Sequence, residues 1–165
     1  MDTKESAAPG IAQRWPMLLM IKLGRITMHR FTEALEPFGI RPRHVAALIE
    51  LRDRGELTQQ TLCGQLHLDP TNLVGILNEL EERGYATRRR DPEDRRRHLV
   101  EVSKKGIAVI EKVSEVMDGV EAELLEDFEP AERAQLEGLL TSIWERSGGY
   151  EAYSQAAAAA DEQAA

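Results

Sequence analysis

Apolar residues recur at intervals of three and four along most of this chain, which is the period of amphipathic α-helices. The spacing predicts helices over residues 11–38, 42–54, 59–66 and 70–83, a long helix over 104–124 and a further helix from residue 130 onward. Two short runs rich in strand-forming residues, 85–90 and 98–103, interrupt this pattern. The pattern therefore predicts a mainly α fold with a small β-hairpin.

Helix boundaries are marked by residues with known end preferences. Pro42, Pro70 and Pro130 stand where the first turn of a helix tolerates a missing N–H, and Thr58 and Asp69 are candidate N-caps. The glycines expected to end helices are Gly39, Gly55 and Gly84. Only residues 67–69 link the third helix to the fourth, so these two form a helix-turn-helix pattern.

Charge is distributed unevenly along a chain whose net charge is -8. Residues 83–97 contain seven arginines and three acidic residues, about +4, whereas residues 106–165 contain 14 acidic and three basic residues, about -11. A concentrated positive hairpin in an acidic protein implies an anionic partner. Double-stranded DNA fits best, because a short helix can enter a major groove while an arginine-tipped loop reaches the adjacent minor groove.

Three segments carry a resemblance to a known family: residues 80–85 (LEERGY), 91–97 (DPEDRRR) and 102–106 (VSKKG). They resemble the multiple antibiotic resistance regulator (MarR) family of winged helix-turn-helix proteins, with Asp94 and Arg96 at the family's Asp-x-Arg wing motif. The resemblance implies a winged helix-turn-helix domain over residues 40–104, flanked by dimerisation helices over 11–38 and 105–148. It also implies a homodimeric regulator, usually a repressor that leaves a pseudo-palindromic operator when a small molecule binds.

The apolar face of the fourth helix fixes which side chains point outward. In its first turn, free N–H groups favour a phosphate near Thr71 and Asn72. We expect Asn72 or Asn78 to pair with adenine edges and Val74 to contact a thymine methyl group. Gly75 allows a close approach to DNA, and the alternatives are tight packing inside the protein or mere tolerance.

In the hairpin, Arg96 is the candidate for insertion into a narrow minor groove. Asp94 is expected to orient an arginine or close the turn rather than to contact a phosphate. Arg43, near the start of the second helix, is expected to contact a phosphate. The remaining hairpin arginines should divide between phosphates and solvent: Arg88, Arg89, Arg90, Arg95 and Arg97.

Heptad-like spacing near both chain ends allows two interpretations. The first and last helices either interlock between two subunits or form an intramolecular bundle. The family resemblance favours the homodimer. It also implies an effector cleft between the dimerisation helices and the DNA-binding lobe, with candidate residues Trp15, Met20, His29 and His44. A histidine on an apolar helix face is also a common core residue, so that alternative stays open.

No arrangement of nucleophiles, bases, metal ligands or phosphate loops indicates an enzyme or a cofactor. Two other functions remain: a winged-helix module that binds a protein instead of DNA, and a redox sensor acting through the single cysteine, Cys63. The sequence shows no signal peptide or membrane span, so we expect a cytoplasmic protein. Residues 1–10 are expected to be disordered and 149–165 to form a low-complexity tail.

Overall fold

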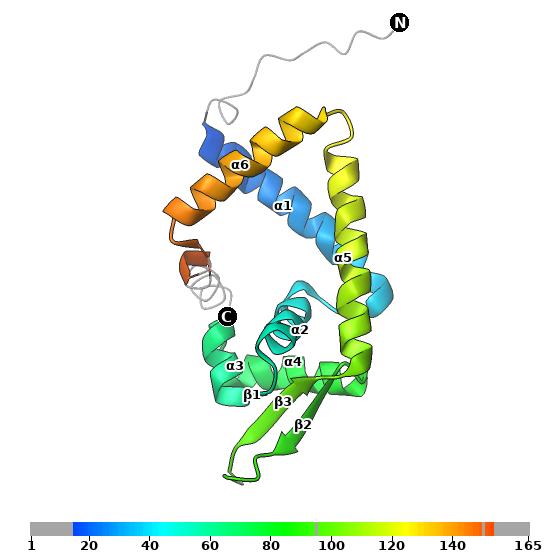
Figure 1. The fold of residues 1–165 in the computed structure, drawn as a ribbon, viewed down its shortest axis with the longest axis vertical. Coiled ribbons are helices and arrows are strands. Elements are labelled where there is room, and N and C mark those ends of the chain that lie inside the picture. The colour runs from blue at the N-terminus through cyan, green and yellow to red at the C-terminus, as the bar shows by residue number, and fades with distance from the viewer. Residues whose placement is uncertain (1–14, 95, 150, 154–165) are drawn as a thin grey trace, which may run out of the picture.

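A computed structural model describes residues 15–94, 96–149 and 151–153. The expected disordered segment 1–10 and most of the tail lie outside these residues. The described residues are mainly helical, and a small sheet lies at one end of the molecule (Figure 1). In chain order they are α1 (Pro16–Leu35), the 3-10 helix η2 (Glu36–Phe38), α2 (Pro42–Arg54), β1 (Leu57–Thr58), α3 (Gln59–Leu66), α4 (Pro70–Glu82), β2 (Ala86–Arg90), β3 (His98–Val102), α5 (Lys104–Leu124) and α6 (Pro130–Arg146).

The predicted helix boundaries are confirmed to within a few residues. Proline opens four helices, and the Asp69, Thr58 and Ser103 side chains cap α4, α3 and α5. The first helix is shorter than expected, because α1 ends at Leu35 and the next three residues tighten into η2 around Pro37.

The core lies where α2, α4 and the start of α5 meet the sheet. Leucines of α2 and α4 are completely buried, and Val100 of β3 closes the core from the sheet side. Gly106 lets α5 pass against the start of the hairpin, since a Cβ there would lie 2.1 Å from the Tyr85 carbonyl oxygen. The core therefore fixes α4 and the hairpin relative to each other.

The expected hairpin is confirmed, and it is part of a three-stranded antiparallel sheet with the order β1-β3-β2. Ala86 pairs with Val102 and Arg90 with His98, so five residue pairs align the two long strands. The hydrophobic pattern does not predict β1, in which Leu57 pairs with Val100. We call β2, β3 and their connecting loop, residues 86–102, the wing.

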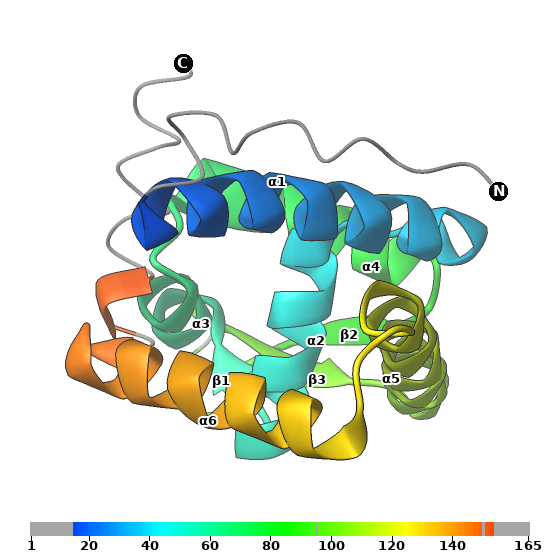
Figure 2. The same cartoon turned by 90° about the horizontal axis from the view of Figure 1, so that it is seen from above.

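The end of α1 reaches the core at Leu35, whereas the start of α1 and the whole of α6 lie away from it. Figure 1 shows α5 rising from the wing to α6, and Figure 2 shows α1 and α6 on opposite sides of the molecule when it is seen from above. No residue of α6, whose whole length is described, is buried. Both helices expose large apolar side chains, including Met17, Ile21, Leu139 and Ile143.

Within the described part of the chain, none of the helices combines the length and the apolar character that crossing a membrane would need.

Candidate nucleic-acid interface

The amphipathic pattern of α4 separates a buried side from an exposed one. Leu73, Ile76, Leu77 and Leu80 face the core. The residues expected to point outward are all exposed: Thr71, Asn72, Val74, Gly75 and Asn78. The helix therefore presents a polar and small-residue surface.

The start of α4 differs from expectation, because its first amides are already occupied. The Asp69 carboxylate accepts hydrogen bonds from the N–H groups of Thr71 (2.8 Å) and Asn72 (3.0 Å). It also accepts a bond from the Asn72 side-chain amide. The backbone bond from Asn72 is the main cause that lowers the pKa of Asp69. A phosphate would thus meet a carboxylate here rather than the free N–H groups that the sequence suggested.

Gly75 lies in the middle of the exposed face of α4. Apart from its chain neighbours and its own helix backbone, no described atom lies within 4 Å of the position that a Cβ would take. The interior-packing alternative for this glycine is therefore wrong. Two explanations remain for a residue that costs helix stability: an approach to an external surface, or mere tolerance of the glycine.

Three of the wing arginines are held by acidic residues of the same chain, and two of them fasten the wing to other elements. The Arg88 guanidinium binds the Glu81 carboxylate and donates to the Asn78 side-chain oxygen at 2.5 Å. Arg89 binds Glu56 at 2.7 Å. These contacts fix the wing to α4 and to the loop before β1, and they make Arg88 less available for DNA than the sequence suggested.

The turn of the wing is closed by Asp94. Its carboxylate accepts the Arg96 backbone N–H at 3.0 Å and lies 3.3 Å from Nε of Arg97. The Asp94 carbonyl also accepts the Arg97 N–H at 2.9 Å. Asp94 thus has the geometry expected of a turn-closing residue, although the guanidinium it pairs with belongs to Arg97. Arg95 lies outside the described residues.

Two wing arginines are exposed, and their side chains have no hydrogen bond or ion pair with any other described residue: Arg90 and Arg96. Arg43 is exposed in the first turn of α2. Since Arg88, Arg89 and Arg97 are paired, Arg90 and Arg96 are the guanidinium groups of the described wing that are open to an external anion.

The four candidate effector residues do not form one site. Met20 and His29 line a shallow groove along α1, together with Met28, whereas Trp15 is exposed at the start of that helix. His44 is 2% exposed, and its Nδ1 accepts the Arg41 N–H at 2.9 Å at the start of α2. The structure thus places His44 in the alternative role, that of a core residue.

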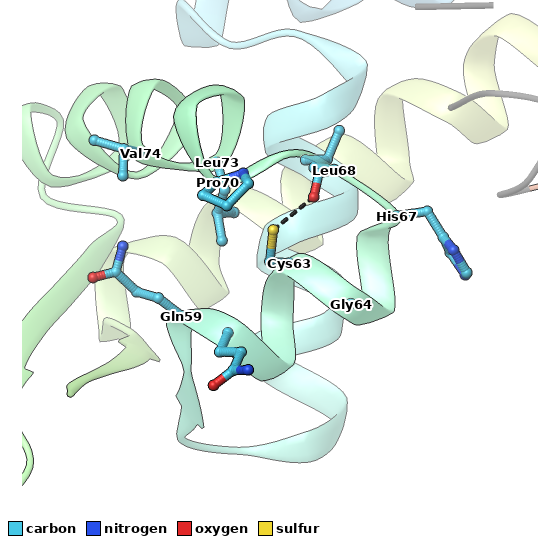
Figure 3. Close-up of a pocket in the computed structure, with 9 residues that line it drawn as sticks. Gln59, Cys63, Gly64, His67, Leu68, Pro70, Leu73 and Val74 are labelled. Atoms are coloured by element: carbon cyan, nitrogen blue, oxygen red, sulfur yellow. Dashed lines mark hydrogen bonds between the residues drawn. The ribbon is translucent and has the colours of Figure 1, made fainter. Parts of the chain in front are cut away.

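A second hollow, of about 560 Å³, lies between α3 and α4 beside Cys63 (Figure 3). The Cys63 thiol donates a hydrogen bond to the Leu68 carbonyl oxygen. Burial is the main cause that raises the pKa of this thiol, and the Asp69 charge raises it further. A reactive thiol needs a lowered pKa, so the redox-sensor hypothesis finds no support in this environment.

Comparisons with known proteins agree with the geometry. Residues 38–97 match a family model described as MarR family. The chain is 33% identical over 104 residues to the helix-turn-helix transcriptional regulator YwoH of Bacillus subtilis, covering 63% of this chain and 75% of YwoH. This chain belongs to the MarR family.

Solved structures of MarR proteins share the fold. A crystal structure of MarR has a TM-score of 0.70 and 25% identity, covering 81% of this chain and 98% of that one. A mutant MarR from E. coli, crystallised with operator DNA, has a TM-score of 0.61 and 24% identity, covering 82% and 99%. The protein is thus a MarR-family DNA-binding transcription regulator with a winged-helix fold.

Proposed function

We propose that this protein is a homodimeric repressor that binds a pseudo-palindromic operator and leaves it when a small molecule binds. The observation that carries the proposal is the exposed polar face of α4 beside a wing with two unpaired arginines, Arg90 and Arg96, among its described residues. This combination suits a helix in the major groove and a cation in the adjacent minor groove.

The dimer is supported by apolar side chains at the end of the molecule opposite the wing. Leu139 is 57% exposed and Ile143 is 46% exposed on α6, and α1 exposes a similar set. On α5 the heptad pattern is buried at Ile110 and Val113, whereas Met117 is exposed. Contiguous exposed apolar faces of this kind mark interaction surfaces. We assign residues 11–38 and 105–148 to dimerisation and 40–104 to DNA binding.

Symmetry then sets the form of the operator. A two-fold dimer presents two α4 helices, which suits half-sites about 10 bp apart in successive major grooves. An effector can release the dimer from DNA only if it binds one conformation better than another, where the conformations differ in the distance between the two DNA-binding lobes. The candidates to line such a site are the residues of the groove on α1, Met20 and His29, and Trp15 at the start of that helix.

The experiment is a titration of the protein with duplexes that it selects from a randomised library, at several salt concentrations. Arg96→Ala should weaken binding by about 1 to 3 kcal/mol, because an unpaired guanidinium leaves the groove. The slope of log K against log salt should also become shallower by about 0.9 for each phosphate that the variant no longer neutralises.

Arg146→Ala is the matched control, since it removes the same charge from the last turn of α6, far from the wing (Figure 1). Its affinity should stay near that of the wild type. Equal losses of affinity in both variants would show that Arg96 contributes only to the overall charge of the protein and makes no specific contact with DNA. An unchanged dissociation constant for Arg96→Ala would show that the wing is not part of the DNA interface.

A further inference from the structure

The exposed face of α4 carries two asparagines whose side-chain amides are each held by a charged neighbour. An asparagine amide has a donor end and an acceptor end, and its hydrogen-bond partners decide which end faces where. The partners of Asn72 and Asn78 have opposite charge. One amide therefore turns its oxygen toward its charged neighbour, and the other turns its NH₂ group.

Asn78 faces a cation. A guanidinium group only donates, so the 2.5 Å contact with Arg88 must involve the Asn78 oxygen. Arg88 is itself fixed, because its Nε donates to Glu81 at 2.7 Å and its backbone N–H donates to the same carboxylate at 3.0 Å. The exposed Asn78 amide consequently turns its NH₂ group away from Arg88, and no described residue accepts a hydrogen bond from these two donors.

Asn72 faces an anion. The Asp69 carboxylate is ionised at neutral pH, as aspartate ordinarily is, and the hydrogen bonds it accepts lower its pKa further. An ionised carboxylate only accepts, so the Asn72 NH₂ group must face it. The Asn72 oxygen and one remaining N–H are left for an external partner.

Gly75 lies midway between these two asparagines, three residues from each. At 3.6 residues per turn the three positions share one side of the helix, and six residues span about 9 Å along the axis. Asparagine side chains are short, so both amides reach a surface only if the helix backbone comes close to it. The open space beside Gly75 permits that approach.

We propose that the two amides recognise base edges of opposite hydrogen-bonding character in the major groove. Asn78 donates to an acceptor edge, guanine N7 and O6 or thymine O4, while Asn72 accepts from an amino group of adenine or cytosine. Arg88 and Asp69 are positioning residues that set these preferences without contacting a base. This inference rests on the proposed DNA-binding function.

The test compares the base preferences of full-length variants selected on a randomised duplex library. Arg88→Met frees the Asn78 amide to rotate, so the preference at one position of each half-site should fall about fivefold, the value of one hydrogen bond. Arg88→Lys, which still only donates, should restore it. Asn78→Asp exchanges donors for acceptors and should abolish the original preference even if Arg88→Met does not fold.

Arg90→Met is the matched control, because it removes a wing charge that has no bond to α4 among the described residues. It should weaken binding to all duplexes alike and leave the base preferences intact. Unchanged preferences in Arg88→Met or in Asn78→Asp would overturn the inference. A wild-type protein that enriches no sequence would instead refute the proposed function itself.

Discussion

His44 is a titratable side chain that lies in the core. Its Nδ1 accepts the Arg41 N–H in a capping arrangement at the start of α2, and its Nε2 lies 3.4 Å from the Glu79 carboxylate without a hydrogen bond. Burial is the main cause that lowers the pKa of His44; Glu79 acts in the opposite direction, and the Arg41 and Arg83 charges lower it further. The folded protein thus keeps this imidazole neutral.

A pH dependence of stability follows from this residue. Below the ordinary histidine pKa of about 6.5, the unfolded chain takes up a proton that the folded protein resists, so the free energy of unfolding should decrease as the pH falls from about 7.5 toward about 5.5. His44→Gln should show a smaller decrease, because a glutamine at this position can still accept the Arg41 N–H without titrating. Urea unfolding at both pH values, followed by circular dichroism, measures the difference. Identical pH dependence in the two proteins would assign the effect to other groups.

At the scale of the helix, Gly75 lowers the stability of α4 at the centre of its exposed face. Alanine is favoured over glycine inside a helix by roughly 1 kcal/mol, and the space beside Gly75 is open. Gly75→Ala should therefore raise the melting temperature by a few degrees. It should also weaken binding to the selected duplex, because the added methyl group holds the helix away from the base edges. Calorimetry and a binding titration on the same sample measure the two effects.

Gly119→Ala provides the control for helix propensity alone. Gly119 lies on α5 off its apolar heptad positions, and a Cβ there also meets no described atom within 4 Å. This variant should gain stability without losing DNA affinity. If Gly75→Ala kept full affinity as well, close approach of α4 to DNA would be disproved and Gly75 would be merely tolerated.

Elements with strong local signals could be predicted from the sequence. Proline, the capping residues and the leucine spacing defined α4, and Gly84 with the strand-like residues after it defined the wing. β1 could not be predicted, because two residues carry no period and its pairing partner Val100 lies far along the chain. Likewise, nothing local pairs Arg89 with Glu56, 33 residues away. The sequence therefore could not separate Arg88, Arg89 and Arg97, which are paired, from Arg90, which has no such partner among the described residues.

Across the whole molecule, charge and apolar surface are separated. The arginines lie on the wing, whereas residues 106–165, which include α6 and nearly all of α5, carry 14 acidic and three basic residues. This acidic half should be repelled by DNA, so it favours binding with the wing and α4 toward the duplex. The exposed apolar residues of α1 and α6 then face away from DNA, where a second subunit can cover them.

The proposed dimer can therefore be tested without changing the DNA-binding surface. The double variant Leu140→Glu and Ile143→Glu places two charges on an exposed apolar face of α6. We expect a monomer in sedimentation experiments. We also expect the affinity for a duplex with two half-sites to fall roughly a hundredfold or more, because the two DNA-binding lobes are no longer tethered to each other.

The control is Ala134→Glu, on the opposite side of α6 by helical period, which should remain dimeric with unchanged affinity. A double variant that stays dimeric would locate the subunit contact elsewhere, whereas a monomer with full affinity would show that each half-site binds independently.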